Sequence, residues 1–297
     1  MGENSPISWT DHTFNPWWGC VKVSPACTNC YAATFDHRLG GDHWGPKSER
    51  KFFGDKHWDG PRKWNRAAQK AGIRARVLCA SMADVFEDRL ELIGPRTKLF
   101  ALIAQTPWLD WLLLTKRPGN LPRMLPWTAD PHASERSEPW SNVWLGTTVE
   151  NQEYADERIP GLLDVPAVVH FVSCEPLLGA LDLRRWLGGA ACLDAFDGTD
   201  GIVIDPSLSW VIAGCESGHG ARRTDVEWFR SLREQCETAA VSFLLKQATE
   251  TVESVLQGEG SKRKGSGVIE LPYLDGVQHA SFPRVTADQA EAMERKP

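Results

Sequence analysis

The sequence lacks any apolar run of about 18 residues, the length that a transmembrane helix needs. Its first ten residues are polar and contain no apolar core, so no secretory signal is expected. No heptad, collagen-like or solenoid repeat is present. These absences argue against membrane-spanning, fibrous and repeat architectures, and they predict a cytoplasmic protein with no membrane partner.

The chain also has fewer basic than acidic residues: 33 Lys and Arg against 39 Asp and Glu, which gives a formal net charge of -6. A broad basic surface for nucleic acid is therefore not expected, whereas a local basic site is compatible with this balance. Eight cysteines in 297 residues are too few for a disulfide scaffold. The 14 tryptophans indicate large aromatic packing units or stacking platforms.

Six short runs of apolar and β-branched residues recur along the chain, with helical patterns in most of the gaps. Nearly continuous apolar character is typical of a strand buried on both faces of a parallel sheet. The runs are Arg76–Ser81, Trp111–Thr115, Val143–Thr148, Val168–Cys174, Trp210–Cys215 and Val241–Lys246, and the helical patterns are Pro61–Ala71, Pro95–Gln105, Gln152–Leu163 and Thr224–Ala240. With a further strand before Cys20, they predict an α/β fold, a partial or complete parallel (β/α) barrel. A doubly wound open sheet is the competing architecture.

We predict a single barrel domain over residues 1–257 and a mobile C-terminal extension over residues 258–297. Three segments read as loop insertions: 40–60, 128–141 and 188–206. The first, extended to Asn65, mixes lysines and arginines with aromatic residues that include Trp58 and Trp64. This composition indicates either a platform that stacks a nucleotide or single strand, or a lid over the barrel mouth. The final helical pattern has Thr224 as its expected N-cap, with Glu227 completing a capping box.

Polar and charged residues follow each predicted strand, at the end where α/β enzymes gather their chemistry. The residues are Ser81, Asp84, Lys116, Arg117, Thr148, Glu150, Asn151, Glu175, Glu216 and Lys246, together with Arg222 and Arg223 on a glycine-rich loop. They indicate a functional site at the mouth of the barrel, where the strands end. Helix caps and surface ion pairs are the alternative interpretation. The five cations, Lys116, Arg117, Arg222, Arg223 and Lys246, could hold an anionic substrate. Alternatively, Lys116 or Arg117 pairs with Glu150 or Glu175 and only balances charge.

The strongest local signal is the spacing C-x6-C-x2-C formed by Cys20, Cys27 and Cys30. Three thiolates so close in sequence can converge on one metal centre, and a C-x2-C turn brings two of them to one face. A [4Fe–4S] cluster on three cysteines would keep one iron open to a small ligand. A zinc site would need a fourth ligand, from His12, His37, Cys79, Cys174 or Cys215. Free thiols without a metal are the third alternative.

The cysteine triad and the motifs SMADVF, LLLTKRP, LGTTVEN, SCEPLLG, AGCESG and LLKQ together resemble the phage and prophage three-Cys-motif family, which is grouped with the radical S-adenosylmethionine (SAM) barrels. The resemblance extends from Ile7 to about Gln247. It implies a [4Fe–4S] cluster on the triad and SAM on the open iron. It also implies reductive cleavage of SAM to a radical that takes hydrogen from a substrate. The chain departs from the commonest radical SAM spacing, C-x3-C-x2-C, in its first gap.

The resemblance also implies roles for the strand-end residues. Ser81 and Asp84 would face the methionine part of SAM, whereas Thr148, Glu150 and Asn151 would face its ribose or carboxylate. Glu175 and Glu216 would face SAM or the substrate. The sequence thus predicts a radical SAM-type enzyme that acts on a small anionic or nucleotide-derived substrate and takes its electron from a donor. The alternatives are a zinc-stabilised nucleic-acid-binding protein without catalysis and a metal-free interaction protein.

Overall fold

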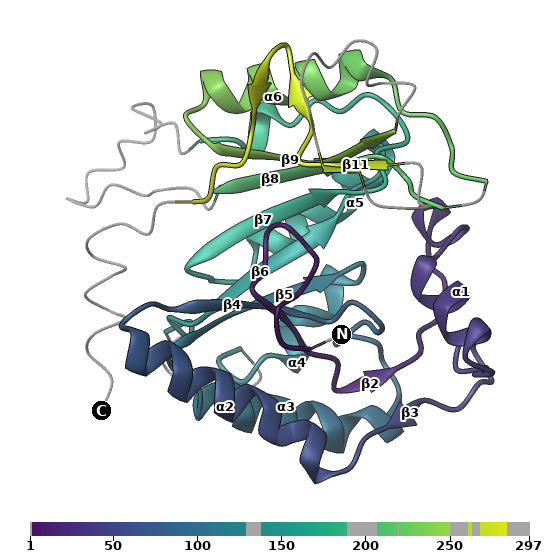
Figure 1. Ribbon diagram of the computed structural model, residues 1–297, viewed down its shortest axis with the longest axis vertical. Coiled ribbons are helices and arrows are strands. Elements are labelled where there is room, and N and C mark those ends of the chain that lie inside the picture. Colours follow the sequence, from purple (N-terminus) through teal and green to yellow (C-terminus); the bar gives the residue numbers. More distant parts are fainter. Residues whose placement is uncertain are drawn as a thin grey trace.

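The computed structural model describes residues 2–128, 138–188, 207–218, 220–249, 261–262 and 268–283 (Figure 1). These residues form a nine-stranded sheet in the order β1-β4-β5-β6-β7-β8-β9-β11-β10. The parallel strands are β1 (His12–Thr13), β4 (Ala75–Cys79), β5 (Leu109–Thr115), β6 (Val143–Thr148), β7 (Val169–Cys174), β8 (Trp210–Gly214) and β9 (Ser242–Thr249). Strands β11 (Val268–Glu270) and β10 (Ser261–Lys262) continue the sheet in antiparallel orientation.

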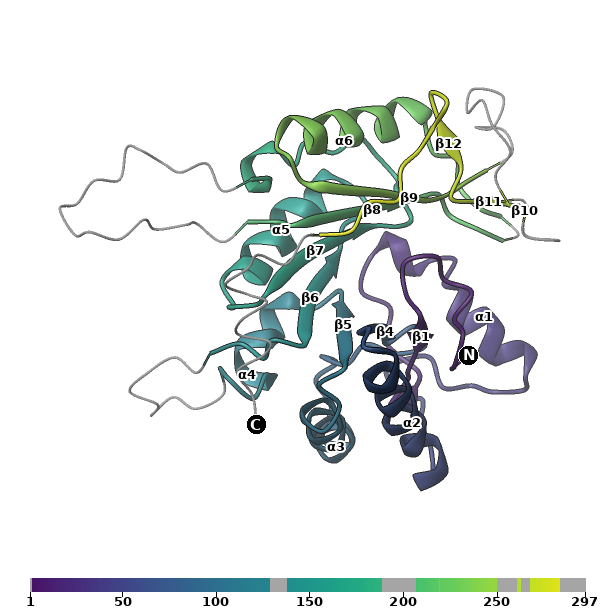
Figure 2. The ribbon, with the colours of Figure 1, turned by 60° about the vertical axis from the view of Figure 1, so that its left-hand side comes forward.

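The sheet is curled, and its helices lie on the convex side (Figure 2). They are α2 (Asp55–Ala71), α3 (Ile93–Ala104), α4 (Leu121–Met124), α5 (Gln152–Leu163) and α6 (Val226–Thr238). The N-terminal segment and α1 (Tyr31–Arg38) lie toward the open, concave side (Figure 2). Because β1 and β10 stand at opposite ends of the strand order, the barrel is partial. The predicted α/β fold with a partial parallel barrel is confirmed.

The central strands are apolar throughout because both of their faces are buried. Along β5, for example, Leu113 packs in the core beneath the helices, and Leu112 packs in a second core on the concave side. Adjacent side chains of a strand point to opposite faces, so two cores require a continuous apolar run. This arrangement accounts for the six runs that the sequence shows, and β6 has the bounds that were predicted.

Aromatic residues fill the core on the concave side, as the tryptophan content predicted. The ring centroid of Trp210 lies 6.0 Å from that of Trp9 and 6.1 Å from that of Trp144, with both pairs edge to face. Phe282 stacks at an angle on Trp210 at 5.2 Å, which brings the C-terminal part of the described chain onto this core. Large rings in tilted and edge-to-face contact suit a space enclosed by a curled sheet.

Two tryptophans that were predicted to lie in a stacking platform or a lid, Trp58 and Trp64, are instead part of the core. Helix α2 begins at Asp55, inside the predicted insertion, and its buried face includes Trp58, Pro61 and Trp64. Residues at spacings of three or four share one helix face, so these rings point toward the sheet. The short hairpin of β2 (Trp17–Trp18) and β3 (Lys51–Phe52) precedes α2.

The start of α6 differs from the prediction by one residue. The side chain of Asp225 accepts a hydrogen bond from the Glu227 amide at 3.0 Å and caps the helix. Thr224, the predicted cap, is buried and donates from its hydroxyl to the Leu177 carbonyl at 2.9 Å. Both are good capping residues, and the tertiary contact of Thr224 decides between them.

Part of the predicted mobile extension is packed against the barrel. Strand β11 pairs with β9, and Val268 and Ile269 are buried there. The hairpin of β12 (Tyr273–Leu274) and β13 (Val277–Gln278) follows, with Leu274 fully buried. An unpaired edge of β9 would expose a row of backbone hydrogen-bonding groups, and β11 covers it. Residues 268–274 thus include paired and buried positions, whereas the mobility of the extension and the domain boundary both stay predictions. Most of the insertions predicted over 128–141 and 188–206 lies outside the described residues.

Candidate functional site

The cysteine loop, residues 19–30, connects β2 to α1. Its first residue, Gly19, has a φ of 107°, and a Cβ there would lie 2.1 Å from the carbonyl oxygen of His43. Only glycine fits such a position. Near the end of the loop, the 3-10 turn Pro25–Cys27 leads to Cys30, the N-cap residue of α1. The turn and the helix start give the C-x2-C part of the motif a defined backbone.

The cysteine loop lies across the carboxyl edge of the sheet. Residues that follow β5, β6 and β8 hold it there through side-chain hydrogen bonds to the loop. The bonds are Arg117 Nη2 to Val21 O (2.8 Å), Ala26 N to Glu150 Oε1 (3.2 Å), Asn29 Nδ2 to Glu216 Oε2 (2.9 Å) and Arg222 Nη2 to Pro25 O (3.0 Å). The fold therefore brings the cysteines and the strand-end residues together, although they are far apart in the sequence.

The three loop cysteines differ from the other described cysteines in their exposure. Cys20, Cys27 and Cys30 are half-buried free thiols. The free thiols of Cys79, Cys174, Cys215 and Cys236 are buried. Metal and cofactor chemistry needs accessible sulfur, whereas a buried cysteine behaves as a small apolar residue. Exposure thus singles out the same three thiols that the spacing predicted.

Two of these thiols have shifted pKa values of opposite sign. Burial, reinforced by the negative charge of Asp84, raises the pKa of Cys20 to about 12, although Arg117 Nη1 lies 3.5 Å from its sulfur. Burial also acts to raise the pKa of Cys27. The positive charge of Lys116 and hydrogen bonds within the loop outweigh it, so the net pKa of Cys27 is lowered. Cys27 therefore forms a thiolate more readily than Cys20 does.

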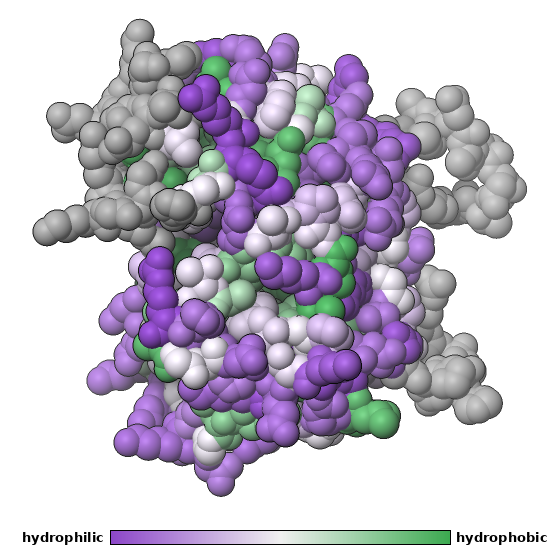
Figure 3. Space-filling model, turned by 90° about the vertical axis from the view of Figure 1, so that its right-hand side faces the viewer, coloured by the Kyte–Doolittle hydropathy of each residue, from purple (hydrophilic) through white to green (hydrophobic). Residues whose placement is uncertain are grey.

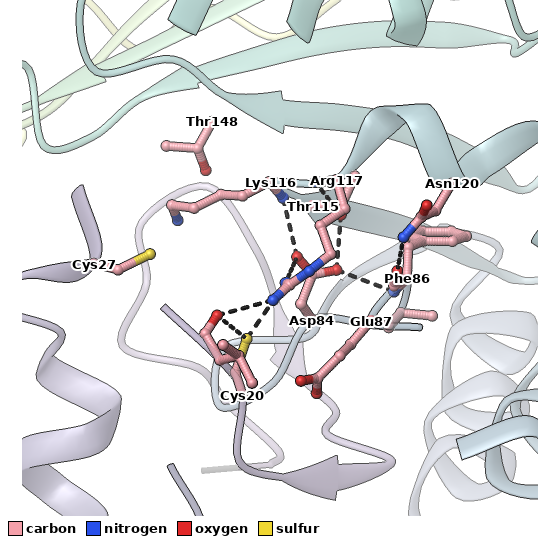
Figure 4. A network of polar contacts seen from close by, with 12 residues as sticks. Cys20, Cys27, Asp84, Phe86, Glu87, Thr115, Lys116, Arg117, Asn120 and Thr148 are labelled. Carbon is pink, nitrogen blue, oxygen red and sulfur yellow. Dashed lines mark hydrogen bonds and ion pairs between the residues drawn. The ribbon is translucent and has the colours of Figure 1, made fainter. Parts of the chain in front are cut away.

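The loop fits a metal centre in the type of its donors, but their present spacing is too wide. Three thiols suit an iron–sulfur cluster or zinc, and the sulfurs of Cys20 and Cys27 point toward the side of the site where Lys116 and Arg117 lie (Figure 4). Among the residues with described positions, no group of three or more His, Cys, Asp or Glu side chains is spaced to hold a metal ion. Metal binding would therefore require the loop thiols to turn toward a common point.

Asp84 connects the ends of β4 and β5 (Figure 4). Its carboxylate accepts hydrogen bonds from Thr115 Oγ1 at 2.7 Å, the Lys116 amide at 3.1 Å and the Phe86 amide at 3.0 Å. It also pairs with Arg117 Nη1 at 2.7 Å. Since Arg117 contacts Cys20 as well, Asp84 positions one of the loop cysteines through Arg117. The carboxylate predicted to face methionine is thus already neutralised by the protein.

Glu150 forms a buried ion pair with Arg158 of α5. The side chains are 0% and 2% exposed, and Arg158 Nη1 lies 3.0 Å from Glu150 Oε2. The same Arg158 nitrogen donates to the Thr148 carbonyl at 2.8 Å, and the guanidinium stacks on the Tyr154 ring at 4.3 Å. Glu150 therefore stabilises the end of β6 and, through Ala26, the cysteine loop.

Two further carboxylates at this edge pair with the predicted substrate cations. Glu216 is buried, and Arg222 binds it with its guanidinium and its amide. Burial acts to raise the pKa of Glu216, but the hydrogen bonds from Arg222 and Asn29 outweigh it and lower the pKa overall. Glu175 forms an ion pair with Lys246. Arg222 and Lys246 thus each balance the charge of a carboxylate. The pair suggested as the alternative for Lys116 or Arg117, with Glu150 or Glu175, is not formed, because these carboxylates pair with Arg158 and Lys246.

The remaining predicted residues have separate surroundings. Ser81 is half-buried beside the Asn15 amide, 3.3 Å from its hydroxyl. Asn151 caps α5, and its side chain accepts from the Tyr154 amide. The last three are Thr148, which is buried, Arg223, which is exposed, and Lys116, which is half-buried and has no carboxylate partner among the described residues.

A family model described as "Protein of unknown function (DUF5131)" matches residues 4–283, which include the cysteine loop and every strand-end motif. The chain belongs to this family. No curated protein matches the chain. Two variants of spore photoproduct lyase are similar in structure, at 13% and 14% identity and TM-scores of 0.45 and 0.46. These matches cover 99% of this chain and 74% and 75% of the lyase chains, and at such values they carry no argument about chemistry.

For this DUF5131 chain, the phage origin and the three-Cys-motif resemblance stay predictions. Cytoplasmic location also stays a prediction. Among the described helices, none is long and apolar enough to cross a membrane.

Sequence reasoning missed Arg158 and Asn29, which complete the site. A signal for Arg158 was present, because the buried positions of α5 are Ala155, Arg158, Ile159 and Leu162. An arginine on an otherwise apolar helix stripe requires a buried acceptor or anion. Asn29 carried no such signal, since its partner Glu216 is 187 residues away in the chain.

Proposed function

We propose that this protein is a radical SAM-type iron–sulfur enzyme, with a [4Fe–4S] cluster on Cys20, Cys27 and Cys30 and SAM at the open iron. The observation that supports this proposal best is the anchoring of the cysteine loop on the carboxyl edge of a partial parallel barrel. The donor set is three accessible thiols, and parallel barrels place their reactive groups at this edge. When bound, such a centre supplies the electron that reductively cleaves SAM.

The protein residues have three tasks in this proposal. The ion pairs Asp84–Arg117 and Glu150–Arg158 keep the cysteine loop in place, and Lys116 favours the thiolate of Cys27 that a metal requires. Of the residues predicted to bind SAM, Ser81, Asn151 and Glu175 are partly exposed at the edge and would contact it. The predicted SAM ligands that are buried would instead support the site: Asp84, Thr148, Glu150 and Glu216.

The substrate is proposed to be a small anionic molecule, with a nucleotide-derived compound as one such class. Arg117, Arg222 and Lys246 already pair with carboxylates. Lys116 and Arg223 have no such partner among the residues that the structure places, so they would contact the substrate first.

The test is anaerobic reconstitution of the full chain with iron and sulfide, followed by metal analysis and an assay for 5′-deoxyadenosine formed from SAM with dithionite. The proposal predicts brown protein with bound iron, and activity that Cys27→Ala abolishes. Cys236→Ala is the matched control, because this thiol is buried in α6 away from the loop. Protein without iron after oxygen-free preparation would sink the proposal. Colourless protein with one zinc per chain would favour the zinc-stabilised nucleic-acid-binding alternative.

A further inference from the structure

A cavity of about 440 Å³ lies beside the cysteine loop, between the segment that follows β5 and helix α5. Its wall includes Val23 of the loop, Lys116 and Arg117 after β5, and Glu157 and Arg158 of α5. Cavities that hold small molecules are typically about 300–1,000 Å³. The size therefore suits a compact ligand, and neither the cluster nor the SAM positions proposed above account for it.

Lys116 brings to this cavity a positive charge that no ion pair among the described residues neutralises. The other two cations of the wall are neutralised, since Arg117 pairs with Asp84 at 2.7 Å and Arg158 pairs with Glu150 at 3.0 Å. The side chain of Lys116 has no carboxylate partner in the described part of the chain. A cation with no partner at a cavity wall favours an anionic ligand.

Arg158 adds a hydrogen-bond donor with no acceptor. Its side chain is 2% exposed, and its Nε is buried without a hydrogen-bond partner among the described residues. A buried donor left unsatisfied costs about 1–3 kcal/mol, so such groups require an explanation. Nε is closed to solvent in this structure, so an oxygen of a ligand in the cavity would accept this hydrogen bond once the guanidinium turns toward it.

Glu157 limits which anions suit the cavity. This residue is exposed, lines the cavity and has no basic partner among the residues with described positions. A simple anion would be repelled by its carboxylate. A ligand that carries a hydroxyl or ammonium donor next to its oxyanion would instead donate to Glu157.

We propose that this cavity binds the phosphate or carboxylate of a small molecule, held by Lys116 and the Nε–H of Arg158. Glu157 accepts a hydrogen bond from a neighbouring donor of the same molecule. A sugar phosphate such as a nucleotide and the amino-acid end of SAM share this chemistry. The ligand site rests on the cavity alone. Its assignment to the substrate or to SAM rests on the proposed function.

The test is calorimetric titration of the full-length protein with inorganic phosphate, AMP and SAM. Lys116→Gln is expected to weaken binding at least tenfold, a loss of about 1.4 kcal/mol. Lys70→Gln, on the exposed surface of α2, is the matched control and is expected to leave binding unchanged. Glu157→Gln is expected to tighten phosphate several-fold and to weaken AMP or SAM relative to phosphate.

The ligand series identifies the source of the oxyanion. Tighter binding of AMP than of phosphate indicates a nucleotide substrate, whereas competition of SAM with phosphate places the amino-acid end of SAM in the cavity. Equal affinities for Lys116→Gln and Lys70→Gln, or no binding of any of the three probes, overturn the inference. SAM cleavage by the reconstituted wild type is measured separately. If the reconstituted protein binds the probes but does not cleave SAM, the proposed function is rejected. If it cleaves SAM but binds no probe in the cavity, only the ligand site is rejected.

Discussion

Replacing Glu150 by glutamine removes one partner of the buried ion pair that supports both β6 and the cysteine loop. Glutamine keeps a side-chain carbonyl that can accept from the Ala26 amide, so the loss is concentrated on the charge of Arg158. With the two side chains 0% and 2% exposed, solvent cannot compensate that charge. Leaving a buried charge unpaired costs about 3–5 kcal/mol. For a chain of this size, each kcal/mol lowers the melting temperature by roughly 2–4 °C.

The assay is urea denaturation of the full chain, with the wild type, Glu150→Gln and the double variant Glu150→Gln/Arg158→Met. The double variant removes both charges, so we expect it to recover most of the stability, to within about 2 kcal/mol of the wild type. A loss below about 1 kcal/mol for Glu150→Gln, as exposed pairs show, would refute the reasoning. If Glu150 bound SAM instead, its replacement would weaken SAM binding and leave the denaturation midpoint unchanged.

Gly146→Ala would place a Cβ 2.3 Å from the ring of Phe171, so we expect a loss of about 1–3 kcal/mol in denaturation. Gly94→Ala is the control, because a Cβ at this position of α3 would meet open space, and it should raise the free energy of unfolding by about 0.4–1 kcal/mol. Equal denaturation midpoints for the two variants would contradict the tight packing of β6. The pH profile of alkylation should show that Cys27 reacts below the ordinary thiol pKa, because its lowered pKa retains thiolate at lower pH. Lys116→Gln should move that profile to higher pH, and an unmoved profile would exclude the charge as the cause.

Most of the fold followed from local patterns. The apolar runs predicted strands β4 to β9 because a strand buried on both faces must be apolar along its length. Helical patterns located α3 and α5 to within two residues at each end. The predicted start of α2, Pro61, was six residues too late. The basic residues before Pro61 obscured the helical periodicity that places Trp58 on the buried face.

Within the candidate site, the sequence predicted the residue types and their gathering at one edge of the sheet, but not their partners. One of the two alternatives paired Lys116 or Arg117 with Glu150 or Glu175, yet the structure pairs these carboxylates with Arg158 and Lys246. The partner of each charged side chain depends on which other side chains the strand order brings close to it. No local sequence pattern contains that order.

By itself, the sequence determined a set of parallel strands, three cysteines close together near the N-terminus and polar residues at the strand ends, and it left a barrel and a doubly wound open sheet as alternatives. These features depend on neighbours within a few residues, through apolar periodicity and motif spacing. Only the tertiary structure decided that the cysteine loop lies across the strand ends and that Arg117 reaches Asp84, 33 residues away. It also decided that Asn29 reaches Glu216, 187 residues away. The face of the molecule drawn in Figure 3 is mostly hydrophilic, with smaller hydrophobic areas between the polar residues. Burial of the strands inside the molecule fixes the long-range contacts, because the edge forms only once the sheet has curled (Figure 2).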